Sequence, residues 1–150
     1  MNEHLDAVYR ATAYAVEGPK GRFTIRIDEP TPPLDALLIR HGTRCWAFVT
    51  ACNPGSMPLA PEENQRRQAE LERMVSAAGY PFLPGEGVGA DATWPSEASL
   101  LILGIATEDA AALGRHFEQN AIVVGTIGEP ARLLWLGEPP GLSRRPARRG

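Results

Sequence analysis

Short hydrophobic runs alternate with segments rich in Gly and Pro along the chain, a pattern typical of many short elements. Residues 22–27 alternate strictly, with apolar residues at 23, 25 and 27, which predicts a half-buried strand. Residues 14–16 are its expected hairpin partner across the turn at 17–21. Two further runs, 45–52 and 99–105, are apolar on both faces and therefore predict central strands.

Three helices and a second hairpin follow from start and stop signals. A short helix at 33–40 ends at Gly42, and a longer one at 61–78 begins with Pro61 and ends at Gly79. Thr107 is the expected cap of a helix at 108–118. The remaining elements are a brief strand at 80–83, a loop at 84–96, and a hairpin formed by 121–127 and 131–136.

These elements predict an α+β fold in a single domain covering residues 1–140. We expect a mixed β-sheet of about five to seven strands with two main helices packed on it. The mixed character follows from a right-handed crossover through the helix at 61–78, which would place residues 80–83 parallel to 45–52. The expected core contains Trp46 or Phe48, together with Leu101, Leu103, Phe117 and Ile122.

Charge separates the body of the chain from its C-terminal end. Hydrophobic residues make up 43% and charged residues 22%, which excludes intrinsic disorder for the body. Four of the 15 basic residues lie in the last seven positions, so the rest of the chain carries 11 basic against 18 acidic residues. Residues 141–150 are predicted to be a disordered basic tail. An acidic body lacks the basic face of nucleic-acid-binding domains, so a nucleic-acid partner is not expected.

Several classes of site and location are disfavoured. There is no signal-peptide pattern and no apolar run that approaches a membrane span, and Cys45 and Cys52 are about 23 Å apart on one extended strand. Two unpaired thiols indicate a reducing compartment, so we expect a cytoplasmic protein without a membrane partner. Residues 85–90 fit G-x-G-x-x-A, but no helix follows them, and the three His residues are scattered. We therefore expect no nucleotide or other cofactor and no metal.

One polar cluster stands out. The buried stripe of the helix at 61–78 continues backwards into Asn64 and Arg67, so this face is apolar at one end and polar at the other. The expected strand directions bring the polar ends of four segments to one sheet edge, where ligands commonly bind. The candidate ligand-binding residues are Asn53, Ser56, Asn64, Arg67, Trp94, Glu97, Ser99, Gln119 and Asn120.

Three interpretations of this cluster remain open. The first is a site for a small polar or anionic ligand, with charge from Arg67 and with Trp94 and the glycines at 85, 87 and 89 forming a lid. The second is an enzyme with Glu97 as acid or base, its pKa raised beside Trp94. The third is a structural network around long loops.

A rival function is protein–protein interaction through the Pro/Gly-rich loop at 81–95. Its apolar residues Phe82, Leu83, Val88 and Trp94 would face the partner.

Several blocks carry a resemblance to a known family. They are residues 41–42, 46–56, 63–64, 67–68, 85–87, 94, 97–99 and 119–122. In this order they resemble the bacterial family called domain of unknown function 3293, over roughly residues 9–136. Ala60 and Cys52 depart from the family pattern, and neither departure removes a proposed ligand group. The resemblance supports the expected fold and implies no particular chemistry.

Overall fold

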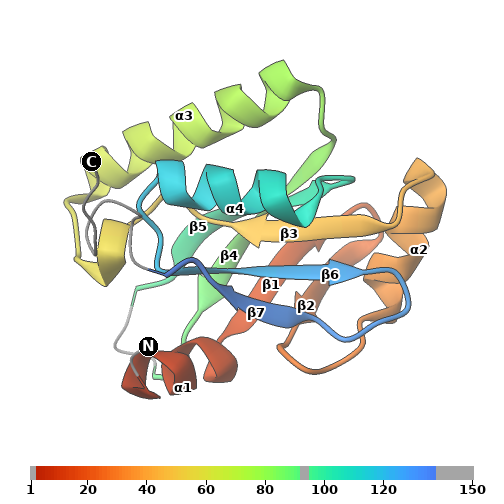
Figure 1. The fold of residues 1–150 in the computed structure, drawn as a ribbon, viewed down its shortest axis with the longest axis horizontal. Helices are drawn as coiled ribbons and strands as arrows, with labels where there is room; N and C mark the ends of the chain where they lie inside the picture. Colours follow the sequence, from red (N-terminus) through yellow and green to blue (C-terminus); the bar gives the residue numbers. More distant parts are fainter. Residues whose placement is uncertain (1–2, 92–94, 138–150) are drawn as a thin grey trace, which may run out of the picture.

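The computed structural model describes residues 3–91 and 95–137, which form a curled seven-stranded sheet with helices on both faces (Figure 1). The strands are β1 (Ala13–Gly18), β2 (Gly21–Ile25), β3 (Cys45–Val49), β4 (Phe82–Val88), β5 (Glu97–Leu103), β6 (Ala121–Thr126) and β7 (Arg132–Trp135). The α-helices in the described ranges are α1 (Glu3–Ala11), α2 (Pro32–His41), α3 (Pro61–Ala78) and α4 (Thr107–His116). A single 3₁₀ turn, η1 (Pro54–Ser56), follows β3. The predicted α+β class is confirmed.

The strand order is β2-β1-β4-β5-β3-β6-β7, and every neighbouring pair is antiparallel. The prediction of a mixed sheet was therefore wrong for the strands that the structure describes, where the single parallel pairing is an isolated bridge between Ile27 and Ala131. The reason is that β3 and β4 are not neighbours in the sheet. The crossover through α3 does return β4 in the same direction as β3, but β5 lies between the two and pairs antiparallel with both.

Two apolar cores lie on opposite faces of the sheet. Leu71 and Val75 of α3 and Ala110 of α4 pack on one face, while Leu34 and Leu38 of α2 pack on the other, where α1 also lies (Figure 1). The expectation of two main helices is not confirmed, because the described chain has two helices on each face. The residues expected in the core are all buried: Trp46, Phe48, Leu101, Leu103, Phe117 and Ile122.

Helix α3 has the bounds that its sequence signals predict. Pro61 is its first residue, and Gly79 follows it in the left-handed conformation with φ 87°. Its buried stripe contains Gln68, Leu71 and Val75. In α4, Thr107 is the first helical residue and Ala106 the N-cap, so the prediction that Thr107 caps the helix was wrong.

Two segments differ from the predicted elements. Helix α1 was not predicted, and the expected loop at 84–96 was wrong for residues 84–88, which continue β4. Strand β4 lies between β1 and β5, so its backbone is hydrogen-bonded on both sides despite Pro84 and its glycines. Pairing with its neighbours therefore outweighs the weak strand propensity of Pro and Gly. Trp94 and the tail at 141–150 lie outside the described residues.

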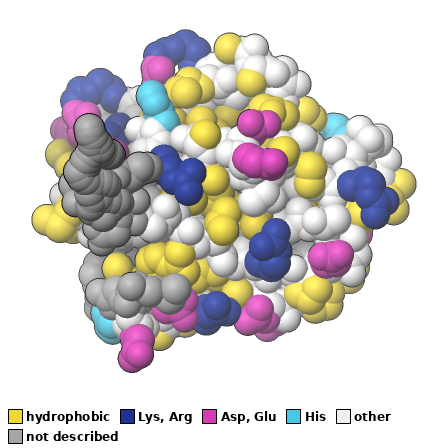
Figure 2. Space-filling model, viewed as in Figure 1, with side chains coloured by type: hydrophobic (Ala, Val, Ile, Leu, Met, Phe, Trp, Pro, Cys, Tyr) yellow, Lys and Arg dark blue, Asp and Glu magenta, His cyan; other side chains and the backbone are white. Residues whose placement is uncertain are grey.

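Strand β3 ends at Val49, three residues earlier than predicted. The Thr50 hydroxyl donates to the Ala98 carbonyl (2.7 Å) and accepts from the Cys52 amide (3.0 Å), which turns the chain at this point. Cys45 and Cys52 are both free thiols, as expected from their separation. On the face shown in Figure 2, acidic and basic side chains are interspersed with apolar ones. Within the described ranges, no helix has both the length and the apolar character needed to cross a membrane.

Candidate functional site

Asn53 connects three elements at the end of β3. Its Oδ1 accepts hydrogen bonds from the Leu59 amide (3.0 Å) and from Asn64 Nδ2 (2.8 Å). Its Nδ2 donates to Glu97 Oε2 (2.7 Å), and its own amide donates to Asn64 Oδ1 (2.9 Å). The backbone at Asn53 is left-handed, with φ 50°, a conformation that Asn tolerates better than most residues. Asn53 thus joins the start of α3 to the start of β5.

Arg67 reaches across the same loop from the first half of α3. Its Nε donates to the Ala51 carbonyl (2.7 Å) and its Nη2 to the Phe117 carbonyl (2.6 Å). Nη1 lies 3.6 Å from a carboxylate oxygen of Glu118, and the guanidinium carbon lies 5.8 Å from the centre of the Phe117 ring. A cation at this place also complements the negative end of the α4 dipole. Two of the five N–H donors of Arg67 are therefore committed to backbone carbonyls, and Nη1 faces the Glu118 carboxylate.

Gln119 has a similar backbone-directed role. Its Nε2 donates to the carbonyls of Cys52 (3.0 Å) and Phe117 (3.2 Å). The backbone is also linked directly, because the Gly55 amide donates to the Glu118 carbonyl (2.7 Å). Together with Arg67, these contacts fix the loop after β3 against the end of α4.

Glu97 is half-buried at the first position of β5. Burial raises the pKa of its carboxyl above the ordinary value, and the hydrogen bond from Asn53 opposes this shift. Among the described residues, Asn53 provides the single side-chain hydrogen bond to this carboxyl. A partly desolvated carboxyl with one donor retains the capacity to accept further hydrogen bonds.

Among the described residues, no side chain fills the space beside Glu97 on the neighbouring strand β4. Tyr14, Gly87 and Glu97 stand directly opposite one another on β1, β4 and β5, so they share one face. A Cβ at Gly87 would have Thr12 Cγ2, at 3.8 Å, as its nearest neighbour. Two positions earlier, the Phe48 ring fills the corresponding space at Gly85. The described residues therefore fill the sheet surface beside Ser99 but not beside Glu97.

Hydroxyl groups from α1 and η1 lie at the same edge. Asn120 Nδ2 donates to Ser56 Oγ (2.9 Å), and the hydroxyl oxygens of Ser56 and Tyr9 are 3.3 Å apart. The Tyr14 hydroxyl donates to the Tyr9 carbonyl (2.7 Å). Burial strongly raises the pKa of Tyr14, with a smaller contribution from the charge of Glu97, so Tyr14 stays protonated.

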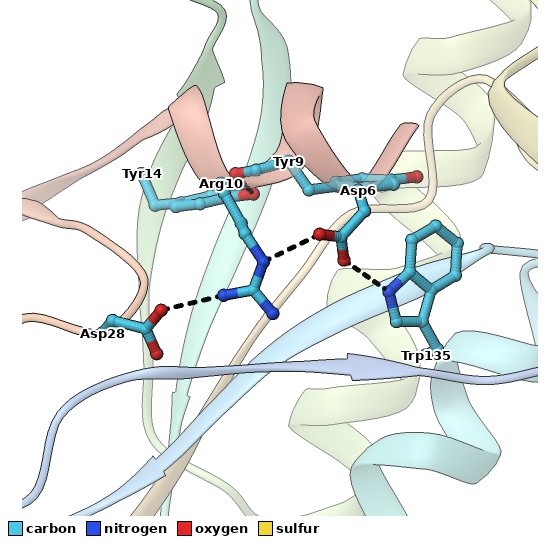
Figure 3. A network of polar contacts seen from close by, with 6 residues as sticks. All are labelled: Asp6, Tyr9, Arg10, Tyr14, Asp28 and Trp135. Atoms are coloured by element: carbon cyan, nitrogen blue, oxygen red, sulfur yellow. Dashed lines mark hydrogen bonds and ion pairs between the residues drawn. The ribbon is translucent and has the colours of Figure 1, made fainter. Parts of the chain in front are cut away.

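Polar contacts hold α1 in place over this face (Figure 3). Asp6 accepts from Trp135 Nε1 (3.0 Å) and from Arg10 Nε (2.9 Å), and Arg10 Nη1 donates to Asp28 (2.8 Å). The indole and the guanidinium lower the pKa of Asp6. The Tyr9 and Trp135 rings meet edge to face, with 5.5 Å between their centroids. These contacts fix Tyr9 beside Ser56 although α1 has no buried residue.

The structure brings most of the predicted residues together. Direct hydrogen bonds join Asn53 to Asn64 and Glu97, and Ser56 to Asn120, while Arg67 and Gln119 are joined to the cluster through backbone carbonyls. Ser99 is buried, and its hydroxyl donates to the Glu97 carbonyl (3.0 Å). Trp94 lies outside the described residues, so its part in the site stays a prediction.

Tyr9 and Tyr14 were not among the residues expected at this site. Tyr14 was assigned to a hairpin strand, and its place at the site depends on β4 pairing with β1. Tyr9 belongs to the unpredicted helix α1. The available signal for this helix was the spacing of Leu5 and Tyr9, which lie four positions apart on a nine-residue amphipathic segment.

The apolar patch proposed for a protein partner is dispersed. Phe82 packs against the core below α3 and α4, and Leu83 against the core on the opposite face. Val88 is 36% exposed, and Trp94 lies outside the described residues. Val88 is thus the single exposed member of the patch among the residues that the structure describes, and a protein partner on this loop stays a prediction.

Two cavities are lined by residues other than those of the polar cluster. One is lined by Glu17, Pro84 to Glu86, Ser96 and Ala98, and the other lies between the β1–β2 turn and α2. In the part of the chain that the structure describes, no group of three His, Cys, Asp or Glu residues could hold a metal ion.

Comparison with known proteins supports the resemblance found in the sequence. A family model described as Protein of unknown function (DUF3293) matches residues 49–122. The matched segment contains Asn53, Arg67 and Glu97 and ends before β7, and it does not include α1. No curated protein and no solved structure matches the chain. The description of the family names no activity.

Proposed function

We propose that the protein binds a small polar ligand at the edge formed by Glu97, Asn53, Ser56, Tyr9 and Asn120, and that the ligand donates hydrogen bonds to Glu97. The observation that carries this proposal is the half-buried Glu97 carboxyl, which has one side-chain donor among the described residues and an unfilled position beside it at Gly87. A partly buried acceptor without its full set of donors costs free energy, which a bound donor would recover.

The available groups favour an amine, amide or hydroxyl ligand over an anion. Arg67 was the expected source of positive charge, but its Nε and Nη2 donate to the Ala51 and Phe117 carbonyls and its Nη1 faces Glu118, which offsets its charge. The groups left to face a ligand are the carboxyl of Glu97 and the hydroxyls of Ser56 and Tyr9. An ammonium group beside Glu97 would also favour the ionised carboxylate and lower its pKa.

The other predicted residues support the site indirectly. Asn64 fixes both the backbone and the side chain of Asn53, and Asn53 in turn orients Glu97. Arg67 and Gln119 hold the loop that carries Asn53 and Ser56. In this proposal they position the ligand-binding groups and do not touch the ligand.

Catalysis with Glu97 as general acid or base is the second candidate. It is favoured by the raised pKa of this carboxyl, since a group that titrates nearer neutral pH transfers protons more effectively under physiological conditions. Such an enzyme would lose turnover in E97Q while retaining ligand binding through the hydroxyls of Ser56 and Tyr9. Simple binding at Glu97 predicts the loss of both.

The test is a thermal-shift screen of small amines, amides and polyols against the full chain. A ligand at 100 times its Kd stabilises the folded state by about 2.7 kcal/mol, which is a readily measured shift in Tm. The shift should disappear in E97Q and in G87V, whose added side chain occupies the open position. It should persist in E86Q, because Glu86 is adjacent in sequence to Gly87 but pairs with Arg22.

The proposal is wrong if every compound that stabilises the wild type stabilises E97Q and G87V to the same extent. Binding would then lie elsewhere, and the polar cluster would be a structural network around the loop after β3.

A further inference from the structure

A second candidate site lies at the far end of β1 from Glu97. A cavity of about 310 Å³ separates the β1–β2 turn from α2. Its walls include Phe23 of β2 and Pro33 and Leu37 of α2. A Cβ at Gly18 would lie only 3.0 Å from Cε2 of Phe23. Because Gly18 has no side chain, the Phe23 ring can lie across the hairpin. The cavity thus has an apolar wall built from both elements.

Two cations border this apolar wall without an ion-pair partner among the described residues. Lys20 in the turn and Arg40 in the last turn of α2 both line the cavity, and neither forms a salt bridge with a described residue. Arg22 also lines it, but its guanidinium pairs with Glu17 and Glu86. No acidic residue is among the described residues that line the cavity. Since acidic residues outnumber basic ones in the chain, two unpaired cations at one hollow indicate a site for negative charge.

We propose that this cavity binds a small amphipathic carboxylate. The apolar body of the ligand lies against Phe23 and Leu37, and its carboxylate lies between Lys20 and Arg40. The volume suits a small molecule, being at the lower end of the range for ligand pockets. A mostly apolar wall with a small number of charged groups at its rim is the arrangement that gives such pockets both affinity and orientation.

This site is independent of the polar cluster. The two sites lie at opposite ends of β1. Tyr14, near the start of the strand, pairs with Gly87 beside Glu97, and Gly18, at its end, lines the cavity. Four residues of extended strand correspond to about 13 Å. The proposal therefore holds or fails separately from the proposed ligand at Glu97.

The experiment is a two-dimensional ¹H–¹⁵N NMR titration of the full chain with phenylacetate. The neutral phenylacetamide and the cationic phenethylamine serve as matched probes with the same aromatic body. Phenylacetate should cause saturable shifts at amides of residues 18–23 and 34–40, and the two matched probes should bind at least tenfold more weakly. K20Q/R40Q should weaken phenylacetate binding at least tenfold, whereas R73Q/R132Q, which removes two exposed cations elsewhere, should not.

A second pair of variants tests the cavity itself. Ala36 is exposed and lines the cavity, so A36F fills the space and should abolish the shifts while leaving the remaining spectrum folded. A77F places the same side chain on the exposed face of α3 and should leave binding unchanged. Equal binding of phenylacetate and phenethylamine, shifts that persist in A36F, or no saturable shift with phenylacetate would each overturn the proposal.

Discussion

The Arg67 side chain is only 19% exposed. Its guanidinium donates to two backbone carbonyls, those of Ala51 and Phe117, which belong to different parts of the chain. Removing a donor from buried acceptors costs their desolvation without compensation. We expect R67A to lower the free energy of unfolding by about 1–3 kcal/mol, measured by urea denaturation.

The neighbouring Arg66 provides the control for this prediction. It pairs with Glu63 on the exposed side of α3, and such pairs contribute little to stability. R66A should therefore change the free energy of unfolding by less than about 0.5 kcal/mol. Equal losses in the two variants would show that the contacts of Arg67 with the carbonyls are not stabilising.

The raised pKa of Glu97 predicts that stability depends on pH. Its folded-state pKa is raised above the ordinary value of 4.5 because burial disfavours the charged form. The folded state therefore binds the proton more tightly than the unfolded state, so the contribution of Glu97 to stability falls as pH rises from 4.5 through the raised pKa. Wild type should lose stability relative to E97Q over this window, in urea melts at a series of pH values.

The hydrogen bond from Asn53 gives a second way to change the pKa of Glu97. That bond favours the ionised carboxylate, so N53G, which keeps the left-handed backbone conformation accessible, should raise the pKa of Glu97 further. Direct NMR titration of the Glu97 carboxyl carbon measures this change. A stability difference between wild type and E97Q that does not vary with pH would contradict the assignment of a raised pKa.

At the scale of elements, β4 gives a matched pair of glycines. Gly85 and Gly87 lie two residues apart and on the same face of the sheet. A Cβ at Gly85 would come 2.6 Å from the Ala15 carbonyl oxygen and 2.8 Å from the Phe48 ring, whereas one at Gly87 has its nearest contact at 3.8 Å. G85A should lower stability by about 1–3 kcal/mol through overpacking.

G87A should be tolerated to within about 0.5 kcal/mol, because it requires no movement of its neighbours. Both variants can be compared by thermal and urea unfolding. A destabilisation of G87A equal to that of G85A would mean that strand propensity, and not the packing of Phe48, decides the effect at both positions.

Elements marked by local signals were predicted correctly from the sequence. Pro61 and Gly79 mark the ends of α3, and the alternation from Phe23 to Ile27 marks β2 and its hairpin. Helix α1 has no buried residue and depends on contacts such as Asp6 to Trp135, which join residues at opposite ends of the chain. Strand β4 depends likewise on pairing with β1 and β5. Neither kind of long-range contact is visible in a local pattern.

The candidate site was predicted in part for a related reason. The directions of β3, β4 and β5 were inferred correctly, so Asn53, Asn64 and Glu97 meet as expected, although β4 and β3 are not neighbours. The side-chain partners did not follow from direction alone. Arg67 was expected to face a ligand, and its reach from α3 to the carbonyls of Ala51 and Phe117 depends on how closely α3 and α4 approach the loop.

At the scale of the whole molecule, one sheet separates two cores. Leu71 belongs to the core under α3 and α4, Leu38 to the core under α2, and both side chains are fully buried. The two cores share every central strand, because alternate residues of β3 and β5 point into each. Neither core can therefore persist without the strands that also form the other.

This arrangement predicts a single cooperative unfolding transition. L71A and L38A should each lower the free energy of unfolding by about 2–5 kcal/mol, the usual cost of such a cavity. In each variant, far-ultraviolet circular dichroism and the fluorescence of Trp46, isolated by replacing Trp94 and Trp135 with Phe, should give the same midpoint. Trp46 lies in the core below α2, so L71A tests whether damage to the opposite core reaches it. If L71A shifts the circular dichroism midpoint but leaves the Trp46 midpoint unchanged, the two cores unfold independently and the sheet does not couple them.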